Sequence, residues 1–123
     1  LYDNRPEMAA ALATRLQAHY PRLKITLMAN DPTGHQLVVN ATPLGMSPDD
    51  PLPLPAELLT PEMFVGEVVM KQAVTPLLAI AKARGCATQQ GTDMLFEMIP
   101  AYLDFFHLPV ATPEQLRALA QID

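Results

Sequence analysis

The sequence predicts an α/β fold in which helices cover both faces of a parallel β-sheet. The first observation is that short segments rich in Val, Leu and Ile alternate along the chain with segments of helical periodicity. The second is that these short segments are almost entirely apolar, as strands are when both faces of their sheet are buried. The third is composition: 123 residues, 50% hydrophobic and 17% charged, suffice for one domain with its own core.

The first part of the chain predicts one helix and two strands. Pro6 suits the first turn of a helix, where its missing N–H costs nothing, and apolar residues then recur every four positions up to about Tyr20. These residues are Met8, Leu12 and Leu16. Alternating apolar residues predict a strand over 23–29, and a Pro–Thr–Gly turn separates it from a short, buried strand over 37–40.

The middle of the chain is dominated by proline. The sequence holds 13 prolines, and six of them fall between Pro43 and Pro61. Each proline removes a backbone donor and fixes φ, so this segment cannot be one regular element. We expect a surface excursion that contains a helical turn near 56–59.

The remaining part predicts two strands and three helices. Thr75 and the proline after it begin a helix that Gly85 ends, and Thr112 with Gln115 forms a capping box for the last helix. The expected ranges are 64–70 and 86–90 for the strands, and 75–85, 91–106 and 112–121 for the helices.

Charge and composition exclude several classes of function. The net charge of −5 and the scattered basic residues argue against a nucleic-acid partner, and no apolar run reaches the about 20 residues of a membrane span. The single cysteine, Cys86, favours a reducing cytoplasm. No metal site is predicted, because His19, His35 and His107 lie far apart with no second His or Cys at ligand spacing.

Candidate functional residues are expected at the carboxyl ends of the strands, where parallel sheets bind ligands. These positions are Asp3, 40–42, 70–71 and Gly91. An acid at the end of a strand and before a helix, as at Asp3, is where dinucleotide-binding folds hold the adenosine ribose; a solvated loop acid is the alternative. Glu67, inside an apolar strand, needs a partner, and both a structural ion pair and catalysis are open.

One string identifies a family. Val39–Met46, "VNATPLGM", resembles the shikimate/quinate dehydrogenase family, and "TPLLAIAKARG" (75–85) and "GTDML" (91–95) follow at the spacing of that family. The resemblance implies an NAD(P)-dependent oxidoreductase acting on a shikimate- or quinate-like cyclic hydroxy acid. Residues 1–123 would be part of its C-terminal, Rossmann-like cofactor-binding domain, with 107–123 a C-terminal helical extension.

The resemblance also implies roles for individual residues. The loop formed by Asn40, Ala41 and Thr42 would lie beside the nicotinamide and its ribose. The backbones of Val68 and Gly91 would approach the nicotinamide end. The residues that would read the adenosine ribose or its 2′-phosphate are Asp3, Asn4 and Arg5. NAD is favoured over NADP, because the Asp3 carboxylate would repel a 2′-phosphate, although Arg5 could bind one.

Two positions depart from the family pattern on the substrate side. Met70 stands where the family usually has a tyrosine, and Met98 where it usually has a glutamine; Lys71 could replace these groups by pairing with a substrate carboxylate. The catalytic Lys–Asp pair of the family belongs to an N-terminal substrate domain outside this chain, so no catalytic residue is expected here. The alternative is a noncatalytic α/β module of the same ancestry that binds a nucleotide or a protein.

The start of the chain carries a last expectation. Leu1–Tyr2 would be the tail of one strand, and the first, central strand with its Gly-rich turn would be missing. Such a sheet exposes unpaired edges, so either the remaining strands close up against each other, or a second copy or the missing N-terminal piece fills the gap. We expect association, and hence a homo-oligomer, because closing the gap would also force the helices on both faces to repack.

Overall fold

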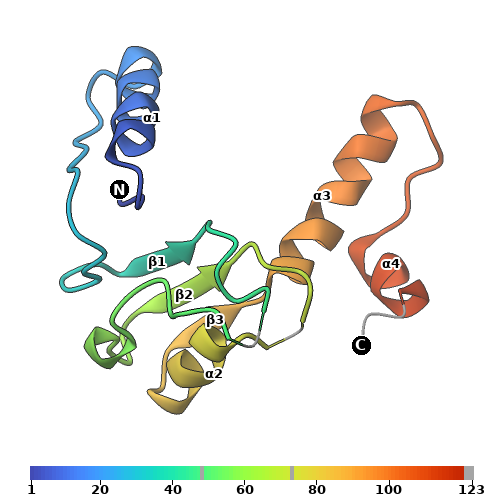
Figure 1. Cartoon of the computed structure of the whole chain (residues 1–123). Coiled ribbons are helices and arrows are strands. Elements are labelled where there is room, and N and C mark those ends of the chain that lie inside the picture. Colours follow the sequence, from blue (N-terminus) through green and yellow to red (C-terminus); the bar gives the residue numbers. More distant parts are fainter. Residues whose placement is uncertain (48, 73, 121–123) are drawn as a thin grey trace.

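The computed structural model describes residues 1–47, 49–72 and 74–120, and it shows a parallel three-stranded sheet combined with helices (Figure 1). The elements are α1 (Pro6–His19), β1 (Leu37–Asn40), the 3₁₀ turn η1 (Ala56–Leu58), β2 (Phe64–Glu67), α2 (Pro76–Ala83), β3 (Ala87–Gln89), α3 (Gly91–Phe105) and α4 (Pro113–Leu119). The strands lie in the order β1-β2-β3. The predicted α/β class with a parallel sheet is therefore confirmed.

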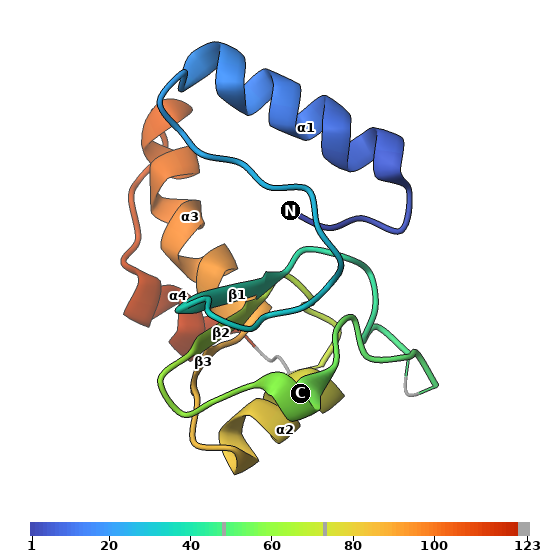
Figure 2. The same cartoon turned by 90° about the vertical axis from the view of Figure 1, so that its left-hand side faces the viewer.

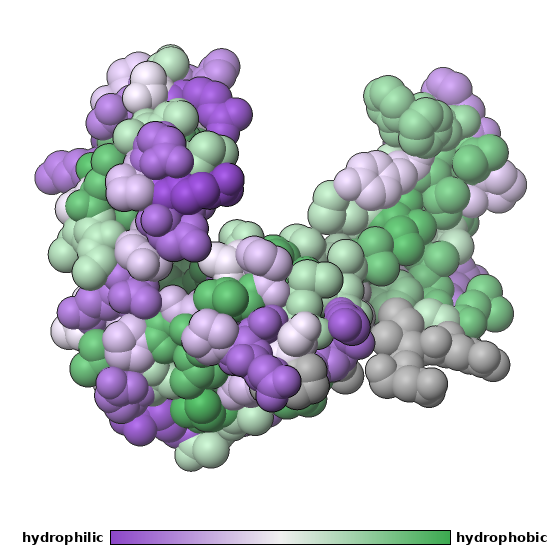
Figure 3. Space-filling view, in the orientation of Figure 1, coloured by the Kyte–Doolittle hydropathy of each residue, from purple (hydrophilic) through white to green (hydrophobic). Residues whose placement is uncertain are grey.

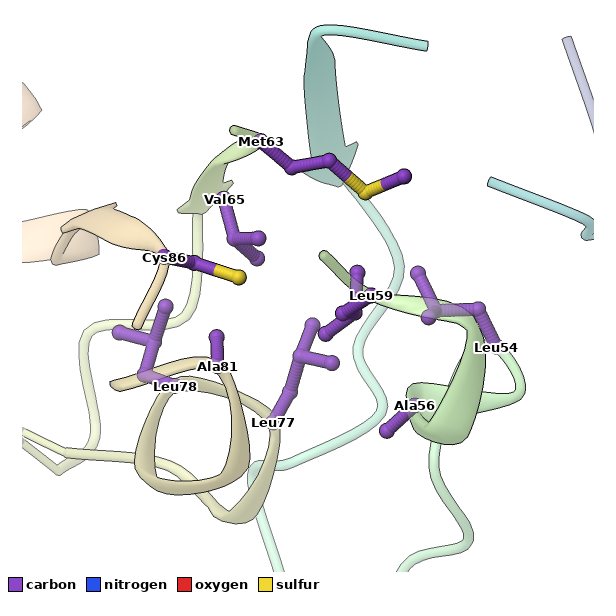
Figure 4. Packing of buried hydrophobic residues seen from close by; sticks show 9 residues of the cluster. All are labelled: Leu54, Ala56, Leu59, Met63, Val65, Leu77, Leu78, Ala81 and Cys86. Atoms are coloured by element: carbon purple, nitrogen blue, oxygen red, sulfur yellow. The ribbon is translucent and has the colours of Figure 1, made fainter. Parts of the chain in front are cut away.

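Helix α2 covers one face of the sheet, and α1 and α3 lie on the opposite side (Figures 1 and 2). Nine residues form the core between α2 and the sheet (Figure 4). They are Leu54, Ala56, Leu59, Met63, Val65, Leu77, Leu78, Ala81 and Cys86. At its centre Val65 of β2 is fully buried, and Leu77 and Leu78 of α2 are each 1% exposed. Burial of apolar surface at this interface is what holds the sheet and α2 together.

The proline-rich segment does not lie wholly on the surface, which corrects the prediction. Leu54, Ala56 and Leu59 belong to the core. Prolines fix an extended backbone that needs no ladder partner, so the apolar residues between them are free to pack. Arg84 at the end of α2 satisfies two carbonyl groups of this segment, since its guanidinium donates to Leu59 O at 2.8 Å and to Glu57 O at 2.7 Å.

The strand over 37–40 is present, but it is not buried as predicted. β1 lies at the edge of the sheet, and its side chains alternate, with Leu37 60% and Val39 54% exposed and Asn40 3% exposed. The exposed residues point to the face opposite α2, where α1 and α3 stand apart and leave open space (Figure 3). Burial of an apolar strand depends on what covers it, and the strand's own residues do not specify that.

The segment 23–29 is extended but forms no strand, which is a second correction. Leu1 N donates to Thr26 O at 2.8 Å and Met28 N donates to Leu1 O at 3.2 Å, the pattern of a parallel pair centred on Leu27. Among the described residues this pairing stays separate from the sheet β1–β3. A single paired residue gives too few hydrogen bonds for a strand. β2 is likewise shorter than predicted, since it ends at Glu67 rather than at 70.

The helix boundaries follow the predicted caps. The Thr75 side chain accepts a hydrogen bond from Leu78 N, and Gly85, with φ of 84°, lies just after α2. Thr112 and Gln115 form the predicted capping box of α4. In α1 the buried residues are Ala9 and Ala13, whereas the expected apolar ridge of longer side chains is largely exposed.

Candidate functional site

The loop after β1 is wound around the side chain of Asn40. The Asn40 Oδ1 atom accepts hydrogen bonds from Thr42 N at 3.1 Å and from Thr42 Oγ1 at 2.7 Å, while Asn40 Nδ2 donates to Leu44 O at 3.0 Å. Leu44 N in turn donates to Thr42 Oγ1 at 3.1 Å. Asn side chains stabilise turns through such bonds to nearby backbone groups. The loop therefore has a shape set by its own polar groups, with Ala41 exposed at its rim.

Glu67 lies beneath this loop, at the end of β2. It is 4% exposed, its Oε1 atom accepts a hydrogen bond from Asn40 Nδ2 at 2.7 Å, and its Oε2 atom accepts one from the Thr75 hydroxyl. Both partners are uncharged and no cation pairs with Glu67 within residues 1–47, 49–72 and 74–120, so of the two open readings of Glu67 the structural ion pair is wrong. The desolvated carboxylate is compensated by two donors, as buried polar groups must be.

Gly45 closes the same loop against Glu67 and α2. Its φ is 100°, a conformation that L side chains rarely adopt, and an added Cβ would lie 3.6 Å from both Glu67 Oε1 and Thr75 Cβ. Gln72 Nε2 donates to Gly45 O at 2.6 Å, and Gly45 N donates to Asp50 Oδ2 at 3.0 Å. Sequence reasoning missed the contributions of Gln72 and Asp50, because neither lies in a recognisable pattern.

The start of α3 packs directly on the chain that follows β2. An added Cβ on Gly91 would lie 2.8 Å from the carbonyl carbons of Val68 and Val69, which no side chain tolerates. Val68 N also donates to Asn40 O at 3.2 Å. The structure thus brings Asn40, Val68 and Gly91 together at the carboxyl end of the sheet.

The other predicted residues are not joined to this cluster by any hydrogen bond or ion pair in the described ranges. Asp3 and Arg5 lie at the start of α1, where Arg5 N donates to Asp3 Oδ1 at 2.8 Å and Arg5 Nε is 3.8 Å from the same oxygen. Asn4 between them is exposed. The three substrate-side residues are also exposed; they are Met70, Lys71 and Met98.

Two of the hollows among the described residues lie away from the carboxyl-end loops. One, of about 260 Å³, is lined by 33–36, Leu58, Thr60 and 62–63, at the amino ends of β1 and β2. The other, of about 620 Å³, is lined by Leu16 and 19–23 at the end of α1. The carboxyl-end loops instead form an open rim below the space between α1 and α3 (Figure 3).

The described part of the chain was also compared with the requirements of a metal site and of a membrane span. No group of three or more His, Cys, Asp or Glu side chains in the described part of the chain could hold a metal ion. None of the described helices is long and apolar enough to cross a membrane.

The parallel sheet with helices on both sides is a Rossmann-like α/β fold, and ligands of such folds lie at the carboxyl ends of the parallel strands. Within that class, the proteins that this chain resembles are shikimate and quinate dehydrogenases. It is 39% identical over 126 aligned positions to the shikimate dehydrogenase (NADP(+)) of Streptomyces avermitilis, an alignment that covers 98% of this chain and 42% of that protein. No protein-family model matches the chain.

Solved structures agree with the sequence comparison. The quinate dehydrogenase of Corynebacterium glutamicum in complex with NAD superposes with a TM-score of 0.81 and 28% identity, over 96% of this chain and 45% of that one. The shikimate 5-dehydrogenase of Thermus thermophilus in complex with NADP(H) and shikimate gives a TM-score of 0.79 and 26% identity, over 95% of this chain and 42% of that one. The predicted family resemblance and Rossmann-like fold are confirmed, and the chain spans less than half the length of these relatives.

Proposed function

We propose that this chain is the cofactor-binding part of an NAD(P)-dependent dehydrogenase that acts on a shikimate- or quinate-like cyclic hydroxy acid. The observation that carries the proposal is the convergence of the Asn40 loop, Val68 and Gly91 at the carboxyl end of the sheet. A nicotinamide cofactor supplies hydride transfer. The protein residues contribute position, since the tight backbone contact at Gly91 fixes the start of α3 beside Val68.

Each group of residues has a distinct part in this proposal. The exposed Ala41 and the half-buried Thr42, held by Asn40, form the rim beside the nicotinamide and its ribose, and the Val68 and Gly91 backbones border the same end. On the substrate side the residues are Met70, Lys71 and Met98. The Lys71 ammonium can pair with the carboxylate of a hydroxy acid, whereas the two methionines offer apolar contact in place of hydrogen bonds.

In this proposal Asp3, Asn4 and Arg5 bind the adenosine end of the cofactor, and the parent enzyme prefers NAD over NADP. The Asp3 carboxylate accepts hydrogen bonds from ribose hydroxyls and repels a 2′-phosphate. Arg5 opposes this preference, but its backbone N–H and its Nε atom both face Asp3 Oδ1. Steady-state kinetics of the parent enzyme with each cofactor test the preference. A higher kcat/KM with NADP overturns it, and Asp3→Asn should move the ratio toward NADP while Arg5→Ala moves it toward NAD.

The partners in this proposal are the small-molecule substrate, the substrate domain of the parent enzyme and a second copy of the chain, all in the cytoplasm. Isothermal titration of the purified chain with NADH and NADPH tests the cofactor role, and we expect saturable binding of at least one. The catalytic groups are assigned to the substrate domain, so the chain alone should not oxidise shikimate or quinate. Turnover above a no-protein control contradicts that assignment. Absence of binding to both cofactors favours the noncatalytic module instead.

A further inference from the structure

Glu67 joins three elements through uncharged partners. It ends β2, accepts one hydrogen bond from Asn40 at the end of β1, and accepts another from Thr75 at the start of α2. All three side chains are buried, at 4%, 3% and 1% exposure respectively. We propose that Glu67 is a positioning residue that fixes the orientation of the Asn40 amide and, through it, the shape of the loop 40–45. The consequence for cofactor binding rests on the function proposed above.

A carboxylate is suited to this role because it only accepts hydrogen bonds. An asparagine amide has two orientations, which exchange its donor and its acceptor ends. Only the orientation that directs Nδ2 at Oε1 is favourable, since the other would place two oxygen atoms 2.7 Å apart. The same orientation leaves Asn40 Oδ1 free to accept from Thr42 N and Thr42 Oγ1. Glu67 therefore decides which end of the amide shapes the loop.

The orientation of the Asn40 amide also fixes residues 41 and 42, which form the rim of the candidate site. Thr42 is held at both its N–H and its hydroxyl by Asn40, and the Thr42 hydroxyl then accepts from Leu44 N at 3.1 Å. The exposed Ala41 peptide lies between these fixed points. Both amide hydrogens and the oxygen of the Asn40 side chain are engaged in this arrangement, so its part in cofactor binding is to shape the loop, while the groups of 41–42 present the binding surface.

If Glu67 only stabilised the fold, any loss of its hydrogen bonds would lower stability without changing the loop 40–45. A variant of Thr75 distinguishes this role from the positioning role. Thr75→Val removes one hydrogen bond to Glu67 together with the helix cap at Leu78 N, but it leaves the contact between Glu67 and Asn40. Glu67→Leu removes the acceptor for Asn40. Glu67→Gln keeps an acceptor for Asn40, because its Nε2 can donate to the Thr75 hydroxyl. Glu67→Asp keeps a carboxylate but moves it away from Asn40 by shortening the side chain. It serves as a second variant in case Glu67→Leu does not fold.

The test combines two measurements on the purified chain. Without cofactor, ¹H–¹⁵N spectra should show shifted backbone amides of 41–45 in Glu67→Leu and Glu67→Asp, near-native ones in Glu67→Gln, and native ones in Thr75→Val. Titration with NADH and NADPH should then give at least a tenfold loss of affinity, or about 1.4 kcal/mol, in the first two variants. Glu67→Gln should restore the affinity, and Thr75→Val should lower the stability while the affinity is kept.

The outcomes separate this inference from the proposed function. Unshifted loop amides in Glu67→Leu and Glu67→Asp overturn the positioning role, whatever the cofactor does. A shifted loop with unchanged cofactor affinity overturns its consequence for binding. Failure of the unmodified chain to bind either cofactor defeats the proposed function and that consequence together, while the spectra still decide whether Glu67 sets the loop.

Discussion

Replacing Gly91 by alanine adds one methyl group where the backbone after β2 already fills the space. The new Cβ would lie 2.8 Å from the carbonyl carbons of Val68 and Val69 and still closer to the carbonyl oxygen of Val69. Backbone atoms cannot rotate away as a flexible side chain can, so α3 must move from β2. Overpacking of this kind costs about 1–3 kcal/mol. The helix preference of alanine over glycine returns at most about 1 kcal/mol, and less at the first residue of a helix.

We therefore expect Gly91→Ala to lower the free energy of unfolding by about 1–2 kcal/mol, measured by urea denaturation at fixed protein concentration. Gly66→Ala is the matched control, because a Cβ there meets its nearest atoms at 3.9 and 4.0 Å, which is ordinary contact. That variant should stay within about 0.5 kcal/mol of the unmodified chain. Cofactor affinity should fall in Gly91→Ala and not in Gly66→Ala. A Gly91→Ala chain as stable as the control refutes the steric argument.

Three further predictions concern the core, the exposed edge and α4. Leu77→Ala should cost about 2–5 kcal/mol of unfolding free energy, because Leu77 is 1% exposed in the core; a urea midpoint close to native contradicts this. The chain should associate at micromolar concentration through its open sheet edge, where Leu37 and Val39 are exposed; sedimentation of a compact, cooperatively folding monomer without a bound peptide rejects it. Hydrogen bonds from its own backbone N–H and from Thr112 lower the pKa of Glu114 below its usual 4.5, so they stabilise α4 above that pH. The protection of the α4 amides, taken as their exchange rate relative to that of an unstructured chain at the same pH, should therefore fall as the pH falls through the lowered pKa; protection that does not change with pH contradicts this.

The helices were predictable from sequence because their signals are local. Thr75 followed by proline, and Thr112 with Gln115, place cap and helix within four residues of each other. The edge strand shows the limit of such signals. Leu37–Asn40 was correctly predicted to be a strand, but its burial depends on which elements cover it, and α1 and α3 leave that face open. The strand predicted over 23–29 also depends on residues distant in sequence, because a strand needs a neighbour to pair with. The described residues supply only Leu1 as that partner, so no strand forms.

For the candidate site, too, only some of the features could be predicted from the sequence. The positions of Asn40 and Gly91 at the carboxyl edge of the sheet could be predicted, because strand ends and helix starts can be recognised in the sequence. The partners of Glu67 could not be read, since Asn40 lies 27 residues before it and Thr75 lies eight residues after it. The parallel register places Asn40 opposite Glu67, and the start of α2 brings Thr75 to the same carboxyl group.

The core residues lie in a short stretch of the sequence, and this affects which parts of the chain unfold locally in solution. All nine core residues lie between Leu54 and Cys86, whereas α4 has no buried residue and α1 buries only two alanines. Backbone amides of β2 and α2 should therefore exchange with deuterium only when the whole chain unfolds. Those of α1 and α4 should exchange through local openings of much lower free energy. We therefore expect residues 54–86 to be the most protected part of the chain, with α1 and α4 opening before it.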